Sequence, residues 1–226
     1  MTPFTWPSPV PGGGTAGEYC LAFDRDRLWR VLIVPALFDE ANRMRRLTVD
    51  VMRRLDRAGI DSFLPDLPGC NESLQPLESQ TPELWRAAMA AAAAHFQASH
   101  VLAIRGGALV APSGLPGWLY APVNGASQLR QMLRARMLSA REAGIEESQD
   151  SLLQLGLAQG LELTGHRLGA AFMAQFQALV PAESARIAQI GQDMVGGPGL
   201  WMRAEPDENR EQADALAAIV AIGVNA

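Results

Sequence analysis

The chain has 226 residues, of which 48% are hydrophobic and 19% charged, and its net charge is −5. This balance excludes a disordered chain, and the negative charge argues against nucleic acid or an anionic membrane as a partner. A chain of this length buries about 70% of its unfolded surface, so it needs no disulfide or structural metal for stability. Cys20 and Cys70 lack zinc-type spacing, and no cofactor is indicated, so we expect a cytoplasmic protein without metal.

The first 17 residues are rich in proline, glycine, serine and threonine. They contain neither a basic region nor an apolar run, so we expect a flexible lead-in and not a signal peptide. Residues 18–226 are then expected to form one domain. Two later apolar stretches, Ala87–Ala94 and Ala213–Val224, are too short or too rich in alanine to span a bilayer, which takes about 20 residues.

Strand and helix patterns alternate from Tyr19 onward, which predicts a mostly parallel sheet with helices on both faces. The first predicted helix has apolar side chains at helical spacing and stops at a glycine, and the second opens with a threonine cap and a proline. An edge strand, two buried strands and these two helices are expected at Tyr19–Phe23, Arg30–Ala36, Ile60–Leu64, Asn42–Ala58 and Thr81–Ser99.

The stretch His100–Ala111 reads as a buried strand that runs into a glycine pair and then into a short apolar helix. It resembles the nucleophile elbow of α/β-hydrolases, whose G-x-S-x-G motif places a serine on a strained turn above the sheet. In Ala103–Gly107 the last glycine is kept, alanine replaces the first, and Arg105 stands at the serine position. We therefore predict that Arg105 lies at the carboxyl end of an inner strand.

Residues 126–180 depart from plain alternation and are predicted to form a small helical lid. A basic amphipathic helix opens this insertion, and its arginines are interpreted as a solvated helix face. These arginines are Arg130, Arg134, Arg136 and Arg141 within Gln128–Glu142. Strands are expected at Gly117–Pro122, Arg186–Gly191 and Leu200–Arg203, helices at Leu168–Leu179 and Asn209–Ile222, and a loop at Gly144–Ser151, while Leu152–Glu162 is ambiguous.

The order of these elements resembles the α/β-hydrolase superfamily over nearly the whole chain, with Pro65–Gly69 after a strand and Gly191–Asp193 near the end. Four motifs resemble, more narrowly, the second branch of the exosortase A system-associated hydrolases: Pro35–Arg46, Ile104–Leu109, Tyr120–Gly125 followed by Leu129–Arg130, and Leu200–Pro206. The resemblance implies a three-layer α/β-hydrolase-like fold and a setting among bacterial exopolysaccharide and protein-sorting systems. It implies no particular substrate.

A serine-triad hydrolase needs a nucleophile, a histidine base after the last strand and an acid that orients the histidine. Asp193 stands where the superfamily places its acid, but no histidine follows it in the sequence. The histidines are His95, His100 and His166, and only His166, in the predicted lid, could reach the site from above. Two of the three triad members are therefore missing.

Charged residues are expected to meet above the elbow. Arg105 would face Asp39 and Glu40 on an earlier loop, and Asp193 and Glu205 would approach from the later strands. An arginine held at such a turn must be paired, because an isolated buried charge is strongly destabilising.

Two interpretations of Arg105 are open. In the first, it forms an internal ion pair that fills the former active site. In the second, Arg105 at the Gly106 turn, together with Asn42 or Arg45, offers a guanidinium fork to a bound carboxylate or phosphate.

Two functions are open as well. The first is an α/β-hydrolase-fold protein without nucleophile and base that binds a small molecule or a protein of an exopolysaccharide or sorting system. The second is a hydrolase or acyl transferase for ester-type substrates, with Glu40, Asp193 and His166 as candidate catalytic residues. A homodimer is compatible with either function.

Overall fold

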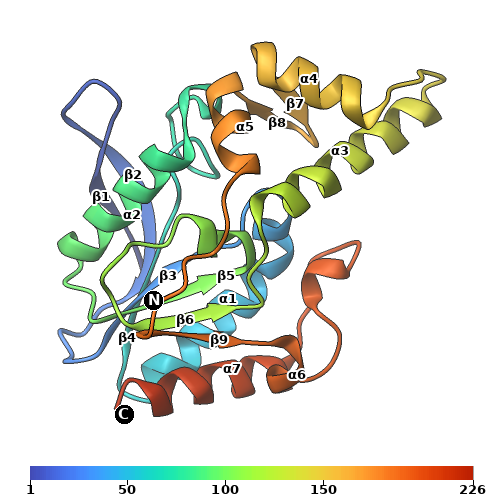
Figure 1. Cartoon of the computed structure of the whole chain (residues 1–226). Coiled ribbons are helices and arrows are strands. Elements are labelled where there is room, and N and C mark those ends of the chain that lie inside the picture. Colours follow the sequence, from blue (N-terminus) through green and yellow to red (C-terminus); the bar gives the residue numbers. More distant parts are fainter. Residues whose placement is uncertain (226) are drawn as a thin grey trace.

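Within residues 1–225, which the computed structural model describes, seven strands form one central sheet (Figure 1). The strands lie in the order β1-β2-β4-β3-β5-β6-β9. Those from β4 to β9 run parallel, whereas β1 and β2 form an antiparallel hairpin that joins β4. Their bounds are β1 Thr2–Pro9, β2 Thr15–Phe23, β3 Arg30–Val34, β4 Asp61–Pro65, β5 His100–Ile104, β6 Gly117–Tyr120 and β9 Ile187–Ile190.

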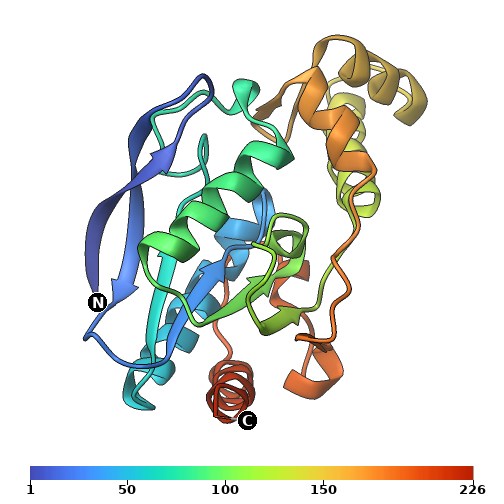
Figure 2. The ribbon, with the colours of Figure 1, turned by 60° about the vertical axis from the view of Figure 1, so that its left-hand side comes forward.

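Helices cover both faces of the sheet, as Figures 1 and 2 show. Alternate residues of β3 point to opposite faces: Val31 and Ile33 pack with helices α1 and α7, and Leu32 and Val34 pack with α2. The helices are α1 Asp39–Arg57, α2 Pro82–His95, α3 Gly125–Glu142, α4 Gln149–Gln159, α5 Ala170–Gln177, α6 Gln192–Val195 and α7 Arg210–Gly223, with 3₁₀ turns η1 Leu77–Ser79, η2 Arg105–Leu109 and η3 Leu200–Met202. The three-layer α/β class with a mostly parallel sheet is thereby confirmed.

The segment between β6 and β9 forms a separate layer above the sheet (Figure 1). It contains α3, α4, the small hairpin of β7 Leu161–Leu163 and β8 His166–Leu168, and α5. Side chains cap three of the longer helices: Asn124 accepts a hydrogen bond from the Ser127 amide at the start of α3, for example, at 2.7 Å. No helix within residues 1–225 has a run long and apolar enough to cross a bilayer.

The N-terminal prediction was wrong. Residues 1–17 are not a lead-in, because β1 pairs with β2 from Thr2 opposite Ala22 to Pro9 opposite Thr15. The side chains of Trp6 and Ser8 are buried beneath this hairpin. The prolines of β1 are tolerated because β1 is the edge of the sheet, where half of the amides need no partner strand.

Two further corrections concern the sheet and one the lid. Tyr19–Phe23 is not an edge strand, because β1 covers that side of β2. Leu200–Arg203 is not a strand, since η3 occupies it, and β9 therefore ends the sheet. The ambiguous Leu152–Glu162 comprises most of α4 and the start of β7, and α4 already begins inside the expected loop Gly144–Ser151.

Candidate functional site

The predicted elbow is present at the carboxyl end of β5, an inner strand of the sheet. Arg105 has φ of 53°, a left-handed conformation that is strained for a residue with a side chain. A Cβ atom on Gly107 would lie 2.3 Å from the Pro35 carbonyl oxygen, so the turn packs directly against the loop after β3. A strained residue followed two positions later by a glycine is typical of a nucleophile elbow. Here arginine stands at the position of the nucleophile.

The Arg105 guanidinium is fully engaged inside the protein. Its Nε and Nη2 donate to the two carboxylate oxygens of Glu40, at 3.1 and 3.0 Å, and Nη1 donates to the Ala121 carbonyl at 2.7 Å. The guanidinium also lies 4.1 Å above the ring of Trp201. Only 12% of the Arg105 side chain and 5% of the Glu40 side chain are exposed, so this is a buried bidentate ion pair.

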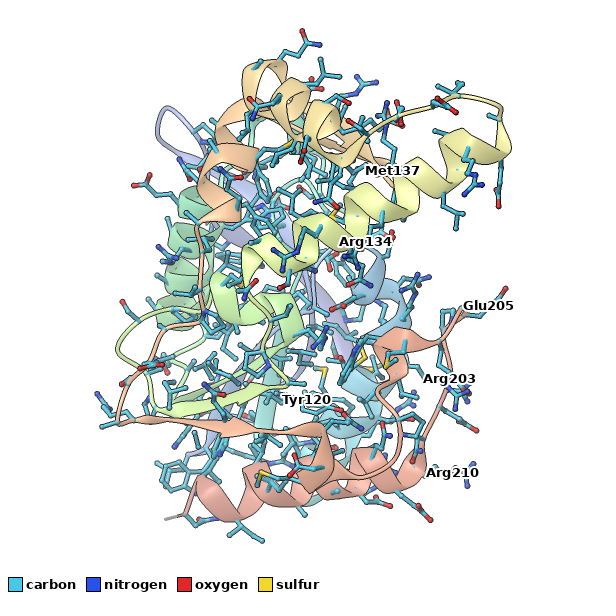
Figure 3. All side chains as sticks on the ribbon, turned by 45° about the vertical axis from the view of Figure 1, so that its right-hand side comes forward. Tyr120, Arg134, Met137, Arg203, Glu205 and Arg210 are labelled. Atoms are coloured by element: carbon cyan, nitrogen blue, oxygen red, sulfur yellow. The ribbon has the colours of Figure 1, made fainter. Side chains whose placement is uncertain are left out.

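Of the carboxylates expected around Arg105, the structure brings in Glu40 alone. Asp193 is exposed at the start of α6, and Glu205 is exposed beyond η3, where Figure 3 shows it pointing away from the molecule. Neither forms an ion pair among residues 1–225. The predicted four-acid cluster was therefore wrong, because β9 ends before Asp193 and the segment carrying Glu205 is not a strand of the sheet.

The two residues expected to assist Arg105 lie elsewhere. Asn42 is exposed, and Arg45 faces the buried carboxylate of Asp66, with 3.7 Å between Arg45 Nη1 and Asp66 Oδ1. Burial raises the pKa of Asp66, although Asn71 donates a hydrogen bond to it at 2.8 Å. The guanidinium fork of Arg105 is thus occupied by Glu40 and is not joined by Asn42 or Arg45.

Gln128 fills the space beside the elbow where a hydrolase would hold an oxyanion. That hole is normally built from the amide after the nucleophile and an amide of the loop after the third strand. The buried Gln128 side chain donates to the Leu37 carbonyl at 3.3 Å, and its Oε1 lies 2.2 Å from where a Cβ on Gly106 would be. The remaining cavity, lined by Phe38, Glu40 and Gln128 among others, has a volume of about 70 Å³.

Tyr120 and Gln192 form a hydrogen-bonded pair near Arg105 and Trp201. The Tyr120 hydroxyl donates to Gln192 Oε1 at 2.5 Å, and burial raises the pKa of Tyr120 to about 12. The Tyr120 ring meets Trp201 edge to face, with 6.1 Å between the ring centroids. Sequence reasoning missed the roles of Gln128, Tyr120 and Trp201, although the last two fall in motifs that carry the family resemblance.

His166 connects the lid to the loop after β3. Its Nε2 lies 3.5 Å from Asp39 Oδ1, and its ring meets the Phe38 ring edge to face at 5.3 Å. Phe38 has φ of 57° and packs against Trp85 of α2 and Phe172 of α5. The lid is therefore closed on the core around Phe38, with no serine or cysteine hydrogen-bonded to His166 within residues 1–225.

A second cavity, of about 290 Å³, lies between the carboxyl ends of β3 and β4 and the turn of the lid hairpin. Its walls are mostly apolar, and His166, Arg167 and Asn71 supply the polar groups. Cys70 also lines it, but burial raises the pKa of the Cys70 thiol to about 12, so the thiol stays protonated. Among residues 1–225, no three histidine, cysteine, aspartate or glutamate side chains are grouped to hold a metal ion.

Comparison with solved structures places this architecture in the α/β-hydrolase fold. Alpha/beta hydrolase domain-containing protein 10 from mouse is similar with a TM-score of 0.59 and 10% identity, over 92% of this chain and 94% of that one. The structure of DcsB in complex with its substrate analogue is similar with a TM-score of 0.57 and 10% identity, over 100% of both chains. At such identity the likeness shows the fold alone. No family model matches the sequence, and no curated protein matches it.

Proposed function

We propose that this chain is a non-hydrolytic α/β-hydrolase-fold protein that binds a small molecule or a protein partner. The observation that carries the proposal is the buried ion pair of Arg105 and Glu40 at the position of the nucleophile. An arginine stays protonated at neutral pH and has no free lone pair with which to attack a carbonyl. The site therefore lacks the nucleophile that begins hydrolysis.

The groups beside Arg105 do not supply another nucleophile or an activated water. Both Glu40 oxygens accept hydrogen bonds from Arg105, so the carboxylate is poorly placed to activate water. Gln128 occupies the space of the oxyanion hole, and the Cys70 thiol is protonated. These contacts support a binding role over the alternative of a carboxylate-based hydrolase or acyl transferase.

The cavity under the lid hairpin is the proposed place for a small ligand. Its volume of about 290 Å³ is near the lower end of the usual range for ligand pockets, about 300–1,000 Å³. Leu37, Leu67 and Leu77 would contact an apolar body, while His166 and Asn71 would orient one polar group. The location outside the carboxyl ends of parallel strands agrees with the general rule for ligands in α/β sheets.

The proposed setting is a bacterial exopolysaccharide or protein-sorting system, with the protein in the cytoplasm. Its support is the resemblance of Pro35–Arg46 and Leu200–Pro206 to the exosortase A system-associated hydrolases. Two of these motif residues, Glu40 and Trp201, are those that hold Arg105. Deleting the gene from its host and measuring secreted polysaccharide tests this setting.

A fluorophosphonate serine-hydrolase probe and a panel of ester substrates test the absence of hydrolysis. We expect no labelling and no turnover. Labelling or turnover that disappears on substitution of Arg105, Glu40 or His166 would reverse the proposal in favour of the hydrolase.

A thermal-shift screen with small aromatic and aliphatic acids and alcohols tests the binding role. Ala41 lines the cavity, so Ala41→Met should fill it and abolish any ligand-induced rise in Tm. Ala171→Met, on the exposed side of α5, is the matched control and should leave that rise unchanged. A rise that survives Ala41→Met would place the ligand elsewhere.

A further inference from the structure

The connection between β5 and β6 lacks the helix that a parallel crossover usually contains. Residues 105–116 include the 3₁₀ turn η2 and no α-helix. A right-handed crossover from β5 to β6 passes over the sheet face that carries α2, so a connection without a helix leaves room on that face. Figure 2 shows the loop after η2 there, next to the extended segment that leads into β9.

A cavity of about 540 Å³ occupies this room, and we call it the crossover cavity. Its volume lies within the usual range for ligand pockets, about 300–1,000 Å³. Its floor consists of buried apolar residues, which are Ala108, Leu109, Pro112 and Leu119. Half-buried Leu115 and Ile187 extend this lining. Such a surface favours an apolar ligand body, because removing apolar surface from water is stabilising.

Three charged side chains stand at the exposed rim of the crossover cavity. Arg86 comes from α2, and Glu183 and Arg186 come from the segment before β9. All three are exposed, and none of them forms an ion pair with another residue in the range 1–225. Two guanidinium groups against one carboxylate leave a single excess positive charge, which favours an anionic ligand.

Arg86 is already held in place at the rim. Its Nη2 donates to the carbonyl of Leu109 at 3.0 Å, and Leu109 itself lines the cavity. The Nε and Nη1 groups of Arg86 donate to no other residue within 1–225, so they are able to bind a carboxylate. A guanidinium whose position is fixed before binding loses less conformational entropy when a ligand arrives.

We propose that the crossover cavity binds a monocarboxylate with an apolar chain, such as a medium-chain fatty acid. The chain lies on the floor of Leu109 and Leu119, and Arg86 and Arg186 hold the carboxylate at the rim. Glu183 disfavours a dianion such as a phosphate monoester, because one excess positive charge balances one negative charge. The inference is independent of the function proposed above, since this cavity shares no lining residue with the cavity under the lid.

Isothermal titration calorimetry with hexanoate, octanoate and decanoate, each below its micellar concentration, measures the binding. Each added methylene should tighten the Kd by about threefold to fourfold while the cavity has room for it. 1-Octanol has the same chain without the charge and should bind several-fold more weakly than octanoate. Equal Kd values for octanoate and 1-octanol, or no binding of any acid at millimolar concentration, would overturn the proposal.

Charge variants test the role of the rim. Arg86→Gln and Arg186→Gln should each weaken octanoate binding by about twofold to fivefold and leave 1-octanol binding unchanged. Glu183→Gln should tighten octanoate binding. Arg57→Gln, at the exposed end of α1, removes the same charge outside the cavity and is the matched control. Arg86→Gln and Arg186→Gln variants that both bind octanoate as tightly as Arg57→Gln does would overturn the assignment.

Filling the cavity tests the place of the chain. Ala111→Met should occupy part of the cavity and abolish octanoate binding, and its Tm shows whether the fold is retained. If this variant fails to fold, the titrations of Arg86→Gln and Arg186→Gln decide by themselves. Ala41→Met fills the cavity under the lid instead. Octanoate binding that is lost in Ala41→Met and kept in folded Ala111→Met would assign the ligand to that cavity and refute this inference.

Discussion

Replacing Arg105 by serine would leave the buried carboxylate of Glu40 without a counter-charge. The Glu40 side chain is 5% exposed, and Arg105 supplies the hydrogen bonds to both of its oxygens. Removing one partner of a buried ion pair costs about 3–5 kcal/mol, because the remaining charge stays buried. For a domain of this size about 2–4 °C of Tm is lost per kcal/mol, so we expect Tm to fall by roughly 6–20 °C.

The assay is a pair of thermal melts, at neutral pH and near pH 5. The variant should regain part of the lost Tm at the lower pH, because protonation neutralises the unpaired carboxylate. Burial favours this neutral form, so the native state of the variant binds the proton more readily than the unfolded state does. The double variant Glu40→Gln/Arg105→Ser should be more stable than Arg105→Ser alone, since it contains no unpaired charge. The new serine should show no esterase activity, because no histidine base lies beside it.

Arg53→Ser is the control for a lost arginine at the surface. Arg53 is 51% exposed and pairs with Asp50 at 2.8 Å within α1, so its loss should cost less than about 1 kcal/mol. An Arg105→Ser variant as stable as Arg53→Ser, or equally stable at both pH values, would refute the reasoning.

Three other predictions concern the elbow, Tyr120 and the cysteines. Gly107→Ala should lower the free energy of unfolding by roughly 2–4 kcal/mol in urea titrations, and Gly106→Ala by less, because the added carbon meets backbone at Gly107 but a movable side chain at Gly106. Since burial raises the pKa of Tyr120 to about 12, the unfolded chain loses its phenol proton first. Stability should therefore fall between about pH 10 and pH 12, and less so in Tyr120→Phe. Burial raises the pKa of both thiols, Cys20 and Cys70, so Ellman's reagent should modify neither in the native protein at mildly alkaline pH and both after unfolding.

The elbow could be predicted because its signal is local. A short apolar strand followed by Gly106 and Gly107 has few alternatives, and the close approach to Pro35 explains why the second glycine is needed. The identity of the Arg105 partner could not be predicted in the same way. By sequence, Asp39, Glu40, Asp193 and Glu205 were all candidates. The last two are excluded only because β9 ends before Asp193 and the segment carrying Glu205 is not a strand of the sheet.

Other features depend on contacts between distant segments. The prolines of β1 argue against a strand, and only its position at the sheet edge makes them harmless. Leu200–Arg203 has strand-like composition, but Trp201 covers Arg105, and this contact favours the turn of η3 over an extended conformation. Gln128 was expected only as the start of a surface helix, yet it is buried because α3 begins directly above the elbow.

The Arg105 side chain ties together four parts of the chain that are remote in sequence: the turn after β5, the first turn of α1 through Glu40, the end of β6 through Ala121, and η3 through Trp201. This arrangement constrains the order in which mutations can accumulate. A serine at position 105 leaves an unpaired acid as long as Glu40 remains, whereas a neutral residue at position 40 leaves an unpaired base. Gain of a serine nucleophile at position 105 is therefore epistatic: it requires a compensating substitution at position 40 before any gain in catalysis can be selected, and a histidine base after that.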